Sequence, residues 1–154
     1  NEIWMRIMSD DIPGLVAALG PLITPRLVEV LMDHTTLYDL AGIPPMGVYP
    51  ERARLMRRWT EMFERHAVVV GPVWPEQAFV AGADMDQGIE MVARTLRHVT
   101  PAARLGLPAM AVPTGVVDGL PVGVQVQADR WHDAWCFEAG RDIEAALGSF
   151  TPPI

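Results

Sequence analysis

The stretch Leu107–Ala128, LPAMAVPTGVVDGLPVGVQVQA, decides the fold of this chain. Two short apolar runs flank the dipeptide Asp118-Gly119, which is a strong turn signal because glycine accepts positive φ angles without steric cost. We therefore expect strands over 109–112 and 122–127, joined by a turn and paired antiparallel. Asp118 is interpreted as a turn residue.

Three residues of the second strand carry further expectations. Pro121 has no backbone N–H, so it should lie at a sheet edge or at the first residue of its strand. Gln125 and Gln127 alternate along one strand face and could reach a polar pocket. The pattern favours a solvated face over such a pocket.

Residues upstream of the hairpin show the apolar spacing of helices separated by Pro and Gly, which predicts a mainly helical region over 1–66. The segment 42–50 should be a loop because it is rich in both residues. The expected helices are one that begins at Asp10 or Asp11, has Pro13 in its first turn and ends near Gly20, one that begins at Thr24-Pro25, and one over 51–66.

In the remaining residues, 67–154, short apolar runs typical of strands occur together with the spacing typical of helices. The run 67–70 suits a strand buried on both faces. A helix should open at Asp84 or Asp86 and end before Pro101, and a closing helix over 132–147 should stop at Gly148, with Trp135, Ala139, Ile143, Ala146 and Leu147 on one face. The fold class is therefore α/β, with helices packed on part of a mixed β-sheet.

Composition narrows the classes of function. The 154 residues are half apolar, which fits one domain or a large piece of one, and the net charge of −7 disfavours a nucleic-acid partner. No apolar run is long enough for a membrane span and no leader is recognisable, so we expect a soluble protein without membrane contact. The single cysteine, Cys136, favours a cytoplasmic location. The chain begins with Asn rather than Met, as a cut segment would.

Several residue types that catalysis commonly uses are scarce. All twelve basic residues are arginine, and the serines are Ser9 and Ser149. The four histidines lack metal-ligand spacing, so no metal site is expected. Cys136 lies on a helix predicted to pack and is not expected to be a nucleophile. His98 is interpreted as a residue at a helix end.

Four segments together resemble the C-terminal signature of the amidase-signature family: Val68–Pro75, Gly106–Ala109, Val112–Gly115 and Gly119–Val126. A closing helix with an acid near its end, here Glu144, is also similar. The resemblance runs from about residue 59 to residue 147, is loose over 1–50, and covers about the last third of the family. It departs at Ala103 and Gly71, where the family often has Asn and Thr, which leaves local pocket contacts open.

The resemblance implies hydrolysis of a carboxylic amide to acid and ammonia or amine by a Ser-Ser-Lys arrangement, without a cofactor. A serine attacks the carbonyl, a second serine relays its proton to a lysine, and backbone N–H groups stabilise the oxyanion. None of these parts maps onto this chain, so we assign it no catalytic residue and expect it to be inactive alone. Trp74, in the Pro-rich loop, is the candidate substrate-binding residue.

The resemblance also implies the partners: a small-molecule amide and the missing N-terminal part of the same enzyme. Residues 1–154 would then be the C-terminal segment of a single amidase domain, with a mainly helical region over 1–66 and the signature strands and closing helix over 67–154. Oligomeric state is left open. The alternatives are an A-type amidotransferase component that transfers ammonia and a stand-alone, non-catalytic homologue.

Overall fold

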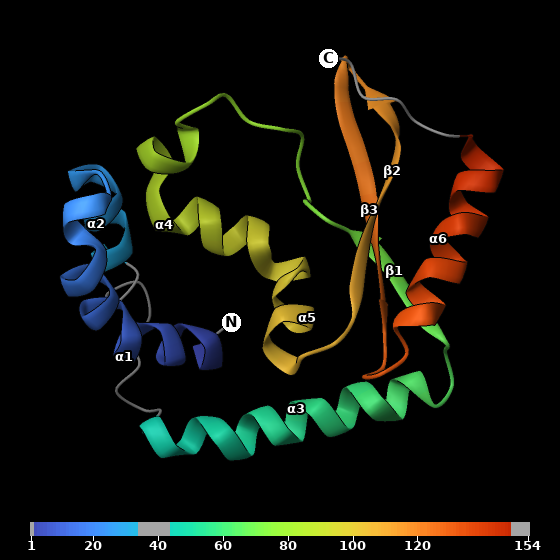
Figure 1. The fold of residues 1–154 in the computed structure, drawn as a ribbon, viewed down its shortest axis with the longest axis horizontal. Helices are drawn as coiled ribbons and strands as arrows, with labels where there is room; N and C mark the ends of the chain where they lie inside the picture. Colours follow the sequence, from blue (N-terminus) through green and yellow to red (C-terminus); the bar gives the residue numbers. More distant parts are fainter. Residues whose placement is uncertain (1, 34–43, 149–154) are drawn as a thin grey trace. The chain divides into compact units, whose positions relative to one another are not determined.

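The computed structural model describes residues 2–33 and 44–148, which contain helices and one antiparallel sheet and confirm the α/β class (Figure 1). The chain divides into two compact units. The first comprises Asn1–Arg54 and Phe79–Arg94, and the second comprises Leu55–Ala78 and Thr95–Ile154. The sheet belongs to the second unit.

The first helix of the first unit is longer than expected. Helix α1 spans Glu2–Leu19 and contains Pro13, so the expectation of a helix that begins at Asp10 or Asp11 is wrong. A proline inside a helix removes one backbone hydrogen bond. Ile12, beside it, is fully buried, and this burial offsets part of that loss. A short 3-10 turn, η1 (Gly20–Leu22), follows.

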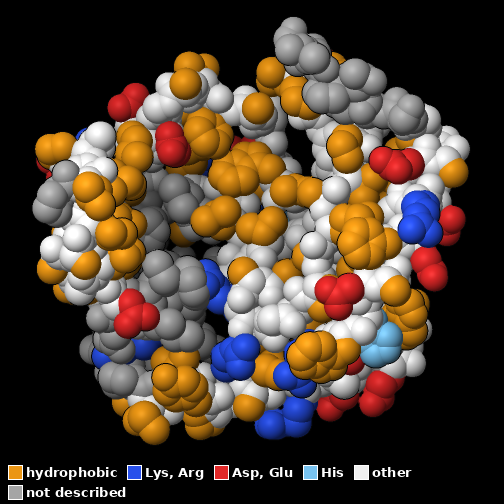
Figure 2. Space-filling view, in the orientation of Figure 1, with side chains coloured by type: hydrophobic (Ala, Val, Ile, Leu, Met, Phe, Trp, Pro, Cys, Tyr) orange, Lys and Arg blue, Asp and Glu red, His pale blue; other side chains and the backbone are white. Residues whose placement is uncertain are grey.

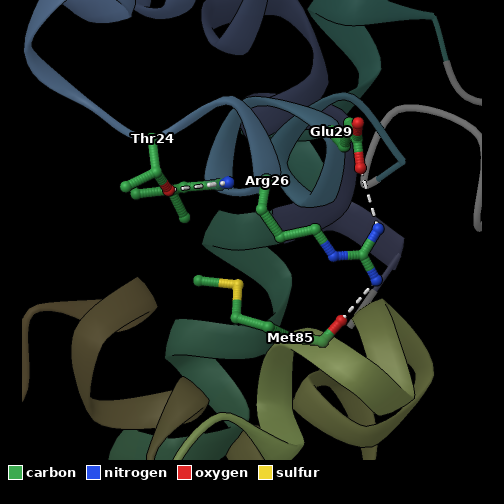
Figure 3. Close-up of polar contacts among 5 residues, drawn as sticks. Thr24, Arg26, Glu29 and Met85 are labelled. Carbon is green, nitrogen blue, oxygen red and sulfur yellow. Dashed lines mark hydrogen bonds and ion pairs between the residues drawn. The ribbon is translucent and has the colours of Figure 1, made fainter.

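The second helix, α2 (Pro25–Asp33), begins where the Thr24-Pro25 signal predicted. The Thr24 hydroxyl accepts a hydrogen bond from the Leu27 N–H at 3.3 Å, as helix-capping side chains do. Arg26 donates to the Glu29 carboxylate at 2.8 Å and to the Met85 carbonyl at 2.6 Å (Figure 3). Arg26 therefore ties α2 to the first turn of α4 inside this unit.

The expected loop over 42–50 contains more regular structure than its composition indicated. A 3-10 turn, η2 (Pro45–Gly47), leads directly into helix α3 (Val48–Phe63), while residues 42 and 43 lie outside the described part of the chain. Pro50 falls in the first turn of α3, where its missing N–H has no helical partner to lose.

The helix expected to open at Asp84 or Asp86 is present, but it does not run without a break to Pro101. Helix α4 (Ala83–Thr95) is interrupted at Gly88, whose φ of 68° and ψ of −161° are not helical. The 3-10 turn η3 (Leu96–His98) and helix α5 (Thr100–Leu105) follow. Pro101 lies in the first turn of α5, so it starts this helix instead of following one.

The sheet of the second unit has the strand order β1-β3-β2, with every neighbouring pair antiparallel. Its strands are β1 (Val68–Pro72), β2 (Ala109–Val117) and β3 (Leu120–Ala128). The predicted hairpin is confirmed: Asp118 and Gly119, between β2 and β3, have φ angles of 52° and 81°. Pro121 pairs with Val116 beyond the end of β1, where only one neighbouring strand needs its backbone groups.

Strand β1 is an edge strand of the described sheet, because it pairs only with β3. Val70 in its middle is 52% exposed. The expectation that this run is buried on both faces is therefore wrong for the described part of the chain. An apolar run alone does not distinguish a central strand from an edge strand.

Helix α6 (Asp133–Leu147) covers one face of this sheet (Figure 1). Ala139 and Ile143 pack against the sheet as expected, whereas Trp135 and Leu147 are 38% and 60% exposed and Cys136 is buried instead. The apolar core on this face consists of Val112, Val126, Ala128 and Cys136. Gly148 ends the helix as predicted, with a φ of 84° and an N–H donated to the Glu144 carbonyl.

The opposite face of the sheet packs against α5 and the C-terminal half of α3. Its buried core consists of Phe63, Ala102, Leu105 and Leu107, with Val69 of β1 packed against them. Because side chains alternate along a strand, Val126 of β3 faces α6 while Gln125 and Gln127 face this second layer. The two glutamines are thereby placed inside the unit.

Candidate functional site

A pocket of about 390 Å³ lies on the sheet face opposite α6 and belongs wholly to the second unit. It is lined by Val73, Val99, Ala102, Ala103, Leu107, Ala109, Met110, Ala111 and Gln125. These residues come from the loop after β1, from α5 and the residues on either side of it, and from strands β2 and β3. Its walls are thus made from most of the segments that carry the family resemblance.

Small side chains on β2 create the space. Alternation along the strand turns Val112 toward the α6 core and leaves Ala109 and Ala111 on the pocket side. Both alanines are exposed, and Ala103 contributes another small side chain from α5. The wall is therefore apolar and shallow, with no charged residue among those that line it.

Gln125 is the polar residue of the pocket wall, and it is only 5% exposed. Its Nε2 donates to the Pro72 carbonyl at 2.9 Å and to the His98 carbonyl at 2.7 Å. The favoured interpretation of a solvated face is therefore wrong for this residue. The turn η3 covers this part of the sheet, and its carbonyl groups require donors that the sheet backbone does not supply.

Gln127 is also buried, at 4% exposure, so the solvated-face interpretation is wrong for it as well. Its Nε2 donates to the same His98 carbonyl at 3.3 Å, which is a longer contact. Its Oε1 is buried and has no hydrogen-bond partner among the described residues. A buried acceptor without a donor costs about 1–3 kcal/mol, so the two glutamines contribute very differently.

Trp74, the candidate substrate-binding residue, lies in the loop directly after β1 and is partly buried. Its neighbour Val73 lines the pocket, whereas Trp74 is not among the lining residues. Its indole Nε1 is buried. Trp74 is thus next to the pocket, and its role in binding stays a prediction.

The other residues considered from the sequence occupy a turn end, the hairpin turn and the apolar core. His98 ends the turn η3, as interpreted, and its carbonyl is the acceptor shared by the two glutamines. Asp118 lies in the hairpin turn and accepts a hydrogen bond from Gln77 at 3.0 Å. Cys136 is buried on α6, and burial is the largest cause that raises the pKa of its thiol.

Residues 2–33 and 44–148 contain neither a cluster of metal ligands nor a helix fit to span a membrane. No group of three or more His, Cys, Asp and Glu side chains in these ranges is arranged to hold a metal ion. No helix in them combines the length and apolar character that a membrane crossing requires.

The hairpin, the helix behind it and the small-residue pocket define a piece of an amidase-type fold. The family model named Amidase matches residues 47–137, more than half of the chain. The chain therefore belongs to the amidase family, as its signature segments indicated.

Sequence relatives agree with this assignment. The A subunit of glutamyl-tRNA(Gln) amidotransferase from Exiguobacterium sibiricum is 33% identical over 102 residues, which are 66% of this chain and 21% of that protein. The protein of the same name from Salinispora arenicola is 36% identical over the same shares of the two chains. This chain therefore spans about a fifth of the length of these relatives.

Solved structures show the same fold. A crystal structure of an amidase matches with a TM-score of 0.75 and 23% identity over 96% of this chain and 35% of the other. The A subunit of glutamyl-tRNA(Gln) amidotransferase from Thermotoga maritima matches with a TM-score of 0.59 and 23% identity, over 96% and 34%. The chain thus covers about a third of the folds it resembles.

Proposed function

We propose that this chain is the C-terminal segment of a single amidase domain, within a cytoplasmic enzyme that hydrolyses a carboxylic amide to acid and ammonia or amine. The observation that carries the proposal is the family match over 47–137, which includes the hairpin strands that line the pocket. The short coverage of the relatives supports the view that most of the enzyme lies outside these residues.

The reacting groups belong to that other part. An alcohol becomes a useful nucleophile only when a neighbouring base removes its proton, and this chain has no lysine for that role. Arginine does not replace it, because a guanidinium stays protonated near neutral pH. This segment contributes pocket walls, and it is inactive by itself.

The partner of this segment is the remainder of the same enzyme. Figure 2 shows apolar side chains among charged ones on the visible face of the molecule. The most exposed large apolar residues are Trp131 at 93%, Val80 at 82% and Leu22 at 80%. The support for this partner is that the chain spans about a fifth of the length of its amidotransferase relatives.

Trp74 contributes to substrate binding from the loop that carries Val73. A tryptophan supplies a broad apolar surface at low entropic cost, which suits a pocket rim. In the full enzyme, Trp74→Ala is expected to raise KM for amides with little change in kcat. Trp74→Phe, which keeps an aromatic ring, is expected to restore most of the affinity. Equal kinetics for all three forms would remove Trp74 from the site.

The experiment that tests the proposed function is an assay of the full enzyme with simple carboxylic amides. Hydrolysis predicts ammonia and carboxylic acid in equal amounts, without a metal or organic cofactor. Failure to release either product from any amide would contradict the proposal.

A second candidate is ammonia transfer, because several relatives carry the name of a glutamyl-tRNA(Gln) amidotransferase component. This function requires an acceptor that receives the ammonia. The net charge of −7 on this segment argues against direct contact with RNA here. Measuring whether released ammonia reaches solution or a bound acceptor separates the two functions.

A further inference from the structure

We infer that the pocket beside Gln125 receives an uncharged aliphatic group of the amide substrate, and that Gln125 is a positioning residue that sets the spacing of its walls. This inference rests on the proposed function and adds the class of substrate. It depends on the lining of the pocket and on the two hydrogen bonds that Gln125 donates.

The lining residues determine which chemical class of substrate group the pocket receives. Every lining residue except Gln125 is apolar, and none is charged. A charged substrate group would lose part of its hydration against this wall without gaining an ion partner, whereas an aliphatic group would gain from leaving water. A volume of about 390 Å³ lies near the lower end of the roughly 300–1,000 Å³ typical of small-molecule sites. The occupant is therefore a small neutral group.

Gln125 holds two walls of the pocket from one amide nitrogen. Its acceptors, the carbonyl groups of Pro72 and His98, immediately precede the lining residues Val73 and Val99. The two carbonyls come from segments far apart in sequence, and the short 2.9 and 2.7 Å contacts fix them relative to β3. Pro72 is also held by its pairing with Val124 of β3, so loss of this nitrogen would loosen both walls but would not detach the first one.

Gln127 provides a matched comparison on the same strand. It is as buried as Gln125, donates only to the His98 carbonyl at 3.3 Å, and is not among the lining residues. If burial of an amide in the sheet were all that mattered, both glutamines would behave alike. If wall spacing matters, Gln125, which contacts both walls, affects substrate preference more than Gln127, which contacts one.

The first test fills the pocket in the full enzyme. Ala111→Leu adds apolar volume at an exposed position of the wall, and Ala103→Leu does so from α5. Rates are measured with straight-chain primary amides from acetamide to hexanamide. One methylene group more or less in an apolar pocket changes kcat/KM roughly 10–200-fold. We therefore expect each variant to lower the preference for hexanamide over acetamide by about tenfold or more.

The matched control is Ala145→Leu, the same change at an exposed position of α6 away from the pocket lining. Its ratio of hexanamide to acetamide rates should equal that of the unmodified enzyme. If both pocket variants fold, as their circular dichroism spectra would show, and keep the unmodified ratio, the pocket is not the aliphatic subsite.

The second test compares Gln125→Met with Gln127→Met in the full enzyme. Both substitutions keep side-chain length and remove the amide. We expect Gln125→Met to raise KM for hexanamide about tenfold, as the loss of one well-made subsite contact would, with a smaller change in kcat for acetamide. Gln127→Met, which removes only the longer contact to the His98 carbonyl, should change the ratio of the two substrates much less. Gln125→Glu, which lacks the donor nitrogen, should not rescue the preference.

The outcomes distinguish the substrate class from the proposed function. If no amide is hydrolysed, the proposed function fails and the substrate class fails with it. If amides are hydrolysed but chain-length preference is unchanged by Ala111→Leu, Ala103→Leu and Gln125→Met, the inference fails while the proposed function stands. Equal shifts in Gln125→Met and Gln127→Met would overturn the positioning role of Gln125.

Discussion

Gly123 lies where β3 passes close to the backbone of β2. A Cβ atom at this position would stand 2.8 Å from the Val112 carbonyl oxygen, and a backbone atom cannot move aside as a flexible side chain can. We expect Gly123→Ala to lower the free energy of unfolding by about 1–3 kcal/mol, as overpacking does. Urea denaturation of the full enzyme followed by fluorescence would measure the change.

Gly71→Ala is the control, since a Cβ at Gly71 in β1 of the same sheet meets nothing within 4 Å. Alanine at an open, compatible position changes stability little or raises it by about 0.4–1 kcal/mol. Equal losses for the two variants would mean that the β2–β3 approach at Gly123 is not as close as described.

The burial of Cys136 predicts how stability depends on pH and how fast its thiol is alkylated. Burial, and then the charge of Asp133, raises the pKa of its thiol above the ordinary value of 9.0. The folded protein therefore holds this proton more tightly than the unfolded chain. Its stabilising contribution is present below pH 9.0 and is lost as the pH rises through the folded-state value.

The measurement for Cys136 is alkylation by iodoacetamide at pH 8, with and without urea. Because the thiolate is the reactive form, the folded thiol should react far more slowly than the unfolded one. Comparable alkylation rates in the folded and unfolded states would contradict both the burial of Cys136 and its interpretation as a packed residue that is not a nucleophile. Cys136→Ala should remove the urea-dependent labelling.

At the scale of elements, α1 offers a direct comparison between sequence pattern and structure. Pro13 lies inside the helix, so Pro13→Ala should restore a backbone hydrogen bond and raise stability by about 1–3 kcal/mol. Pro25→Ala, at the first residue of α2, restores none and should be neutral or slightly destabilising. Thermal melts read by circular dichroism would compare them. No gain for Pro13→Ala would favour a helix that begins near Asp11.

The hairpin could be predicted from local chemistry alone. The dipeptide Asp118-Gly119 allows the positive φ angles of the turn, and the alternation over 122–127 sets the faces of β3. Strand existence and pairing therefore followed from residues next to one another. The same holds for the start of α2 at Thr24-Pro25 and the end of α6 at Gly148.

The pocket could not be predicted in the same way. Whether Gln125 is solvated or buried depends on η3, which lies about thirty residues earlier and covers the sheet through contacts that no local pattern encodes. The burial of Cys136 instead of Trp135 on α6 has a similar cause, because Gly140 of the same helix fits against Met110 of β2. Trp74 lies in a loop whose neighbouring residue lines the pocket, yet its contact with substrate stays a prediction.

At the scale of the whole molecule, the chain is a pocket-bearing piece of a larger catalytic fold. The match to an amidase structure covers 96% of this chain but only 35% of the other, and this chain contains no lysine. We propose that these residues supply binding surfaces, while the rest of the enzyme carries out proton transfer and nucleophilic attack.

Ammonia release from a primary amide tests this separation, when it is measured for the purified 154-residue chain and for the full enzyme side by side. We expect no release above the buffer rate from the chain alone and steady release from the full enzyme. Turnover by the chain alone, free of contaminating enzyme, would contradict the division of roles between this segment and the rest of the enzyme.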